Sequence, residues 1–366
     1  MARVLITGGA GFIGGHVARA LIARGDRVRV LDSFIPQVHP PGIRPSRQLD
    51  GAEIIRGDVR DPDAVVRALA GIDKVVHLAA EVGVGQSMYA VDRYVSVNDQ
   101  GTAVLLQALI ERPVARVVVA SSMSVYGEGL YRAADGSLIE DVVRDPARGW
   151  DAVAADGTPL LPVATPEAKR ANLASVYALT KYVQERLVLT LAPAYGMQGV
   201  ALRLFNVYGP GQALSNPYTG VLAIFAARLL NNQRPAVFED GAQRRDFVHV
   251  DDVAAAFLLA LDHPAAAGGV FNIGSGRSIA IADVARAMAE AMGRTRLEPE
   301  VLGKARAGDI RHCFADIARA RAVLGFAPRR GFAESLPALA AWVERQRAVD
   351  LVAQARRELE QRGLVA

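Results

Sequence analysis

Three side chains in the middle of the sequence could together move a proton. Tyr177 and Lys181 are four residues apart in residues 173–191, whose apolar periodicity predicts a helix. Side chains at this spacing share one helix face, so the phenol and the ammonium point the same way. Ser122 lies just after the predicted strand 116–120. A tyrosine beside a lysine and a serine hydroxyl has the components of a general base.

The elements that would position this chemistry begin at the N-terminus. Residues 3–6 form a short apolar run typical of a buried parallel strand. The run leads into the glycine-rich turn 7–14 and then into the apolar-periodic residues 17–23. In such a strand, turn and helix, Gly11 lets backbone N–H groups approach a pyrophosphate, and Gly14 lets the helix pack closely on the strand.

A second predicted strand, residues 27–31, ends in Asp32. This is about the separation at which a dinucleotide-binding unit places an acid on the adenosine ribose. A 2′-phosphate would meet a like charge there, so the sequence favours NAD over NADP as the cofactor.

Strands and helices continue to alternate along the first half of the chain. Further strands are predicted at 53–56, 74–78 and 116–120, and a long helix is predicted at 94–112. Residues 78–80, at the end of one strand, include two alanines, which allow a flat group to lie against the backbone. The alternation predicts an α/β fold with a doubly wound parallel sheet of the Rossmann type.

Length and composition restrict the class of protein. The 366 residues are 51% hydrophobic and 22% charged, as in ordinary globular enzymes. No apolar run approaches the roughly 20 residues that span a bilayer, and no signal-peptide pattern precedes the first strand, so we expect no membrane partner and a cytoplasmic location. A net charge of +4 without a basic stripe argues against nucleic acid. Cys313 is the only cysteine, which excludes an intrachain disulfide.

Taken together, these motifs resemble the extended short-chain dehydrogenase/reductase family, in particular its NAD-dependent nucleotide-sugar epimerases and dehydratases. The resemblance runs from residue 4 to about residue 336. The segments that carry it are Thr7-Gly-Gly-Ala-Gly-Phe-Ile-Gly14, Asp32, Gly57-Asp58-Val59, His77-Leu-Ala-Ala80, Asn98, Ser121-Ser122, Tyr177-x-x-x-Lys181, Arg203-Leu-Phe-Asn206-Val-Tyr-Gly-Pro210 and Arg245-Asp-Phe-Val-His-Val-Asp251.

The resemblance implies a role for each matching residue. Ser122, Tyr177 and Lys181 would be catalytic. NAD would be bound by Gly8, Gly11, Phe12, Ile13, Gly14, Asp32, Asp58, Val59, Leu78, Ala79, Ala80, Asn98, Tyr177 and Lys181. A nucleotide-diphosphate sugar would be bound by Ser122, Met123, Ser124, Asn206, Arg245, Arg306 and Asp309. The resemblance implies no metal site.

A tyrosine base must lose its proton near neutral pH, although its ordinary pKa is about 10. Lowering that pKa to about 7 takes roughly 4 kcal/mol. We expect Lys181 and the positive nicotinamide ring to provide it, with Ser122 bridging the substrate hydroxyl and the phenolate.

The choice among the family's reactions depends on the two residues after Ser122. Dehydratases of this family carry Asp then Glu there to expel water, whereas this chain has Met123 and Ser124. This departure favours a 4-epimerase that works through a transient 4-keto-hexose. Residues 215–221 and 308–313 are similar to a bacterial subgroup with dTDP-L-rhamnose 4-epimerase activity. UDP-glucose or UDP-N-acetylglucosamine 4-epimerase, a nucleotide-sugar dehydratase and a non-catalytic NAD-binding regulatory protein remain alternatives.

The chain is expected to form two lobes and a tail. Residues 1–205 would form the NAD-binding domain, with an insertion or lid at 128–172. Residues 206–345 would form a smaller C-terminal substrate lobe, interleaved with the sheet around 245–275. Residues 346–366 would be a helical tail, most simply a solvated one because of its charge.

The resemblance also implies a homodimer. In this family the helices predicted here at 94–112 and 173–191 pair across a two-fold axis.

Overall fold

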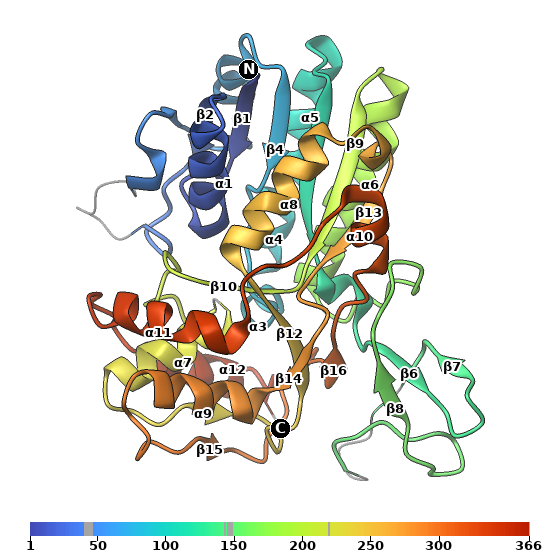
Figure 1. Ribbon diagram of the computed structural model, residues 1–366, viewed down its shortest axis with the longest axis vertical. Coiled ribbons are helices and arrows are strands. Elements are labelled where there is room, and N and C mark those ends of the chain that lie inside the picture. The colour runs from blue at the N-terminus through green and yellow to red at the C-terminus, as the bar shows by residue number, and fades with distance from the viewer. Residues whose placement is uncertain (40–46, 143, 145–148, 219, 366) are drawn as a thin grey trace.

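A seven-stranded sheet organises the larger lobe (Figure 1). The computed structural model describes residues 1–39, 47–142, 144, 149–218 and 220–365. The strands are β1 (Arg3–Thr7), β2 (Arg27–Asp32), β3 (Glu53–Arg56), β4 (Lys74–His77), β5 (Arg116–Ser122), β9 (Gln198–Leu204) and β13 (Val270–Ile273). Their order is β13-β9-β5-β4-β1-β2-β3, and every pair is parallel. The predicted doubly wound parallel sheet is confirmed.

Continuous apolar runs explain why these segments form the centre of the sheet. Ile6 on β1 pairs with Val76 on β4, Val76 with Val118 on β5, and Val118 with Val200 on β9. All four side chains are fully buried. Strands that are covered on both faces need not alternate apolar with polar residues, so their sequences are continuous apolar runs rich in β-branched residues.

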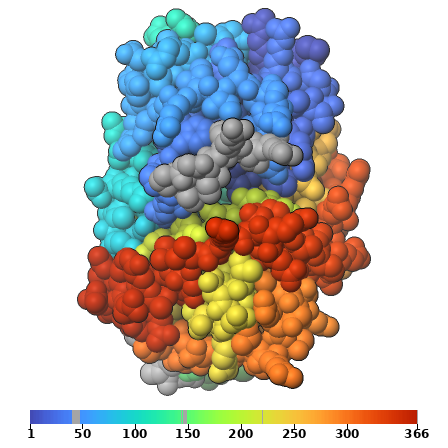
Figure 2. Space-filling model, turned by 90° about the vertical axis from the view of Figure 1, so that its left-hand side faces the viewer, coloured from blue at the N-terminus to red at the C-terminus, as the bar shows by residue number. Residues whose placement is uncertain are grey.

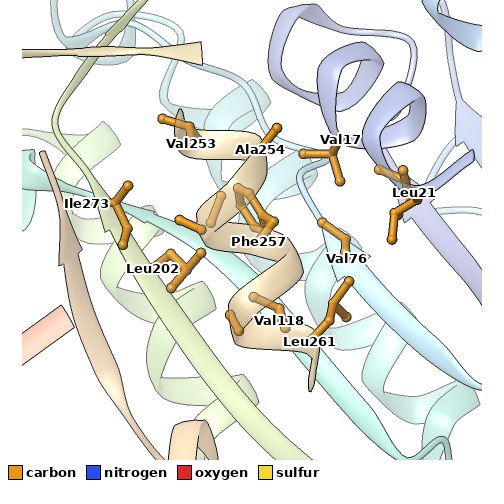
Figure 3. Close-up of a cluster of buried hydrophobic side chains, with 14 of the residues drawn as sticks. Val17, Leu21, Val76, Val118, Leu202, Val253, Ala254, Phe257, Leu261 and Ile273 are labelled. Carbon is orange, nitrogen blue, oxygen red and sulfur yellow. The ribbon is translucent and has the colours of Figure 1, made fainter. Parts of the chain in front are cut away.

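Helices cover both faces of the sheet. One face packs against α1 (Phe12–Ala23), α8 (Val250–Asp262) and α10 (Ala318–Leu324), and the other against α2 (Pro62–Leu69), α5 (Gly101–Glu111) and α6 (Val176–Ala194). Figure 3 shows the first of these layers, where Phe257 of α8 lies between Val17 of α1 and Leu202 of β9. The helix predicted at 94–112 is continuous but composite, because α4 (Val91–Tyr94) leads through the π-helical turn η2 (Val95–Gln100) into α5.

The smaller lobe lies below the carboxyl ends of the large sheet (Figure 1). Its core packs α7 (Val221–Leu230), α9 (Ile281–Ala291) and α11 (Phe332–Val343) together. A second sheet joins β10 (Asn206–Tyr208), β12 (Arg244–His249) and β14 (Ser278–Ala280), with β16 (His312–Cys313) beside β12. Between β12 and β14 the chain returns to the larger lobe as α8 and β13, so the two lobes share one chain path.

Residues 128–172 contain a small antiparallel sheet of β6 (Leu130–Arg132), β7 (Leu138–Ile139) and β8 (Leu161–Val163). Arg311, which is fully buried, pairs with Asp151 of this segment at 2.8 Å and with Glu239 of the smaller lobe at 2.9 Å. The pair between Arg311 and Asp151 fastens the segment to the smaller lobe. Residues 143 and 145–148 of the predicted insertion lie outside the described residues.

The C-terminal tail is helical, but it is packed instead of solvated. Helix α12 (Val352–Glu360) buries Ala355 and Leu359. Its Glu358 accepts hydrogen bonds from Tyr89 at 3.1 Å and Tyr218 at 2.9 Å. The high charge of this segment hid a narrow apolar face, which is formed by Ala355 and Leu359 one turn apart. Residue 366 of the predicted tail is not described.

The remaining short elements are α3 (Val84–Ser87), β11 (Ala236–Val237), β15 (Glu300–Val301), η1 (Arg47–Leu49), η3 (Met123–Tyr126) and η5 (Pro264–Ala266). Across the described ranges, no helix combines the length and apolar character needed to cross a membrane.

Candidate active site

A cavity of about 1050 Å³ opens at the carboxyl ends of β1, β2 and β4. The glycine turn and residues 31–39 form its wall in the larger lobe, and residues 211–216 face them from the smaller lobe. Trp342, Gln346 and Arg347 at the end of α11 also reach it. Figure 2 shows the face where the N-terminal lobe, in blue, meets the yellow and red segments of the smaller lobe. Ligands of open α/β sheets bind at this edge.

The glycine turn is shaped for close approach of the backbone. Gly8 has φ +67°, and a Cβ there would lie 2.7 Å from the backbone nitrogen of Ala79. A Cβ on Gly14 would lie 2.5 Å from the Cα of Gly9, so only glycine allows the helix to start so near the strand. A Cβ on Gly11 would meet only the Gly8 carbonyl oxygen, at 3.3 Å, and would otherwise enter the cavity. Helix α1 has no acidic residue in its first turn, so its amino end is open to an anion.

Asp32 forms a rigid carboxylate in the cavity wall. Its Oδ2 accepts the Ala10 N–H at 3.0 Å, and its Oδ1 accepts the Phe34 N–H at 2.8 Å. Each carboxylate oxygen has a second lone pair, so both can still accept a hydroxyl. Asp58 lies further along the wall, where hydrogen bonds from Arg60 lower the pKa of its carboxyl group.

Tyr177, Lys181 and Ser122 line the same cavity. The hydroxyl of Ser175 caps α6 by accepting the Ala178 N–H at 3.1 Å, which places Tyr177 in the first turn and Lys181 one turn later. Ser122 is the last residue of β5, at the carboxyl end of that strand. The structure thus brings together the three side chains that the sequence singled out.

The electrostatics of the tyrosine differ from expectation. Burial raises the pKa of Tyr177 above its ordinary value, and hydrogen bonding with Ser122 opposes the rise. The Lys181 ammonium donates to Oε1 of Gln184 at 2.6 Å. Burial lowers the pKa of Lys181 to about 7, against the attraction of Glu185. The protein groups alone therefore leave Tyr177 protonated at neutral pH.

Other expected cofactor residues also lie in the wall, with one exception. Phe12, Ile13, Val59, Leu78, Ala79 and Ala80 line the cavity. Asn98 is fully buried behind the wall, where its Oδ1 accepts the Glu81 N–H at 2.7 Å and its Nδ2 donates to Thr180 at 2.9 Å. Asn98 therefore links the segment after β4 to α6.

Of the residues expected to bind a sugar nucleotide, Ser122 lines this cavity, and the other six lie outside its wall. Met123 and Ser124 are buried in η3, and the Ser124 hydroxyl donates to Oγ of Ser122 at 2.9 Å. Asn206 begins β10, and its buried Oδ1 has no hydrogen-bond partner among the described residues.

The three charged members of that set are held by the smaller lobe itself. Arg245 donates to the backbone carbonyls of Ile310 and Arg311. Arg306 pairs with Asp309 at 2.9 Å, and its guanidinium lies over a phenylalanine ring. Within the segment 215–221, Ser215 and Asn216 line the cavity, and residue 219 is outside the described residues.

Part of the motif at 245–251 is structural. Asp246 is buried and accepts the backbone N–H groups of Ser275, Gly276 and Ala315. Asp251 pairs with His16 of α1 at 2.8 Å, which joins the start of α8 to the glycine-turn helix.

Several residues of the wall were not predicted from the sequence. Glu81 is buried in the wall and pairs with Arg93 at 2.7 Å. Gln37 donates to Gln86 and to Asn216, each at 3.2 Å, and so bridges the two lobes beside the cavity. Glu81, Gln37 and Asn216 lie in irregular segments without a spacing signal, and only the tertiary fold brings them to the cavity.

A parallel sheet with a glycine cradle, an acid at the end of β2 and a Ser-Tyr-Lys group in one cavity defines a dinucleotide-binding enzyme of the Rossmann class. More specifically, the chain belongs to the NAD dependent epimerase/dehydratase family, whose model matches residues 4–274.

Individual relatives cover nearly the whole chain. A dTDP-L-rhamnose 4-epimerase of Burkholderia thailandensis is 36% identical over 352 residues, which cover 94% of this chain and 95% of the relative. A dTDP-glucose 4,6-dehydratase of Streptomyces niveus is 30% identical over 94% of each chain. The solved structure of MoeE5 in complex with UDP-glucose and NAD has a TM-score of 0.75 and 33% identity, covering 94% of this chain and 99% of that one.

Proposed function

We propose that this protein is an NAD-dependent nucleotide-sugar 4-epimerase and that dTDP-L-rhamnose is the first substrate to test. The observation that carries the proposal is the placement of Ser122, Tyr177 and Lys181 on the wall of one dinucleotide-sized cavity. The 36% identity to a dTDP-L-rhamnose 4-epimerase supports the choice of sugar. Similarity to a solved complex with UDP-glucose and NAD supports the substrate class.

The residues present fit NAD. The amino end of α1 and the space in front of Gly11 suit a pyrophosphate, and the fixed carboxylate of Asp32 suits a ribose with free hydroxyls. Bound NAD supplies an acceptor that takes a hydride from the sugar and returns it.

The chain's own residues would handle the proton. Tyr177 would remove the proton of the C4 hydroxyl, and Ser122 would hold that hydroxyl by a hydrogen bond. Lys181 would hold the nicotinamide ribose. The resulting 4-keto sugar would turn over within the site and accept the hydride on its other face. Tyr177 would then return the proton.

A dehydratase is the second candidate, because a dehydratase is among the 30% identical relatives. Elimination of water needs an acid beside the sugar. Met123 has no proton to give, and the Ser124 hydroxyl is already donated to Ser122. These two positions favour epimerisation.

The nucleotide sugar is proposed to reach from this cavity into the smaller lobe. Asn206 supports this, because a buried amide oxygen without a partner gains from a ligand hydrogen bond. Arg245, Arg306 and Asp309 are proposed to hold the diphosphate and the nucleoside ribose, and a bound ligand would replace the ion pair between Arg306 and Asp309.

A homodimer is also proposed. Val91, Val95 and Leu179 on α4, η2 and α6 are 44%, 40% and 45% exposed, which leaves apolar surface on the helices expected to pair. Light scattering during size-exclusion chromatography should give twice the chain mass, and Leu179→Glu should shift the protein to the monomer. A monomeric wild-type protein would refute this assembly.

Incubation with single substrates tests the function. The purified protein is mixed with dTDP-L-rhamnose, UDP-glucose or UDP-N-acetylglucosamine, without added NAD, and each reaction is followed by NMR. A product inverted at C4 supports a self-contained epimerase and identifies its sugar. A 4-keto-6-deoxy product would point to a dehydratase instead. If none of the three substrates reacts while NAD is still bound to the protein, the result would point to a non-catalytic NAD-binding protein.

A further inference from the structure

Lys181 is held by an amide that the proposed mechanism does not use. Its ammonium is buried and donates to Oε1 of Gln184 at 2.6 Å, one turn along α6. Gln184 is itself fully buried. On its other side, Nε2 of Gln184 donates to Oγ1 of Thr102 at 2.8 Å and to the carbonyl of Ala79 at 3.2 Å. The amide thus spans from the catalytic lysine to the cavity wall after β4.

The chemistry of the neighbours fixes the orientation of this amide. An exchange of Oε1 and Nε2 would face an NH₂ group to the ammonium and an oxygen to the Ala79 carbonyl. Both contacts would be repulsive, since an ammonium only donates and a carbonyl only accepts. Gln184 can therefore be satisfied in one orientation only, with its acceptor toward Lys181.

His77 supports this arrangement from the end of β4. The Thr102 hydroxyl donates to the Asn98 carbonyl, so it can only accept from Nε2 of His77, and Nδ1 of His77 then accepts from the Thr7 hydroxyl at 2.7 Å. The imidazole then carries its proton on Nε2 and donates it to Thr102 at 2.8 Å. Burial, together with the charge of Lys181, lowers the pKa of His77 to about 3, so the ring stays neutral beside the lysine.

We propose that Gln184 is a positioning residue for the reaction: its amide oxygen fixes the Lys181 ammonium at the cavity wall, and its amide nitrogen anchors that ammonium to the ends of β1 and β4 through Thr102, Ala79 and His77. A lysine fixed in this way is held on the same cavity wall as Tyr177. Removal of the amide oxygen leaves the buried ammonium without its hydrogen-bond acceptor, which disfavours the charged form.

Few other charges act on Lys181. Glu185, on the same helix, favours the charged lysine, but its carboxylate is shared with Arg203 on β9 and accepts a hydrogen bond from Ser121 on β5. His77 faces the lysine from β4 as a neutral ring. Tyr177 shares the cavity wall and is protonated at neutral pH. Gln184, which also lies 3.2 Å from Nε2 of His77, is the uncharged neighbour that accepts a hydrogen bond from the ammonium itself, so its substitution acts on Lys181 most directly.

The sequence offers a direct measurement. The chain contains four lysines, at 74, 169, 181 and 304. Protein grown with lysine labelled with ¹³C at Cε gives four NMR signals, and Lys181→Met identifies the signal of Lys181. The pH titration of this signal reports the lysine directly, without substrate and without turnover.

Two substitutions should move the titration in opposite directions. Gln184→Met keeps the side-chain volume but removes the acceptor, and should lower the pKa of Lys181 by about one unit. Gln184→Glu replaces the acceptor by a carboxylate and should raise it by a similar amount. The control is Gln107→Met on the exposed side of α5, which should leave the titration unchanged. A residue that only fills space would not shift the lysine in both directions.

Equal titrations in all variants, or shifts of the same sign in both Gln184 variants, would overturn the proposal. Thermal unfolding of each variant shows whether the fold is retained. Only the kinetic measurement rests on the proposed function: in Gln184→Met the acid limb of the pH profile of kcat should move, with KM for the nucleotide sugar nearly constant. A wild-type protein without turnover would refute the proposed function, while the NMR titration would still decide the role of Gln184.

Discussion

The carboxylate of Asp32 accepts the backbone N–H of Ala10 at 3.0 Å, so the acid at the end of β2 is fixed to the glycine turn. A fixed negative charge discriminates against a 2′-phosphate more strongly than a mobile one. Asp32→Asn should therefore weaken NAD binding and raise the ratio of NADP to NAD affinity by at least about tenfold. Calorimetric titration with both nucleotides measures the ratio. Asp50→Asn, at an exposed position, is the control, and an unchanged ratio in Asp32→Asn would remove Asp32 from the ribose site.

Two glycines of the same turn should respond differently to alanine. Gly14→Ala places a Cβ 2.5 Å from Gly9, so the helix must move and the protein should lose about 1–3 kcal/mol of folding stability. Gly11→Ala meets one atom at 3.3 Å and keeps an ordinary backbone conformation, so stability should change little while NAD affinity falls. Denaturant unfolding and NAD titration of both variants check the contrast. Strong NAD binding by Gly11→Ala would place the pyrophosphate elsewhere.

Tyr177→Phe removes the proposed base and little else. We expect turnover to fall by about 10²- to 10⁴-fold, the usual contribution of a general acid–base group. The melting temperature should stay close to wild type, because the ring still packs edge-on against Tyr94. NMR of the substrate reaction measures the loss, and Tyr195→Phe, at the exposed end of α6, is the matched control. Near-wild-type turnover in Tyr177→Phe would exclude the phenol as the base.

His77 should make the protein sensitive to acid. The pKa of His77 in the folded chain is about 3, below the ordinary value of 6.5. Between these two pH values the unfolded chain binds a proton at His77 that the folded chain does not bind. The stability that depends on His77 is complete above about pH 6.5 and is lost as the pH falls toward 3, at about 1.4 kcal/mol per pH unit.

Between pH 6 and pH 4, His77→Gln should reduce the slope of the unfolding free energy against pH by the equivalent of about one proton. The substitution should also lower stability at pH 7. Urea unfolding at several pH values gives the slopes, with His263→Gln at the lobe surface as the control. An unchanged slope in His77→Gln would mean that another group carries the acid sensitivity.

The local patterns predicted most of the sheet and the catalytic group. Each strand expected in the first half of the chain is present, because unbroken apolar runs such as 116–120 leave few alternatives to a buried strand. The spacing of Tyr177 and Lys181 was sufficient to place both on one wall, since α6 is regular from its serine cap onward.

Other features depend on contacts that the sequence alone does not reveal. The sheet of residues 130–163 consists of strands of two or three residues, too short for a periodic pattern. The length of α12 and its charge concealed the apolar face with Leu359. The rise in the pKa of Tyr177 comes from its burial in the folded chain, and the Lys181 ammonium is held by Gln184, a residue without a motif of its own.

The position of α8 and β13 in the chain has a consequence for biosynthesis. Phe257 of α8 fills the core beneath the strands of the first 205 residues, and β13 adds the final strand beside β9. These segments leave the ribosome only after β10, α7 and β12 of the smaller lobe have been made. The N-terminal lobe must therefore wait, with one face of its sheet covered by α1 alone, until about three quarters of the chain has been translated. Fragments that stop near residue 205 should consequently need a chaperone to stay in solution.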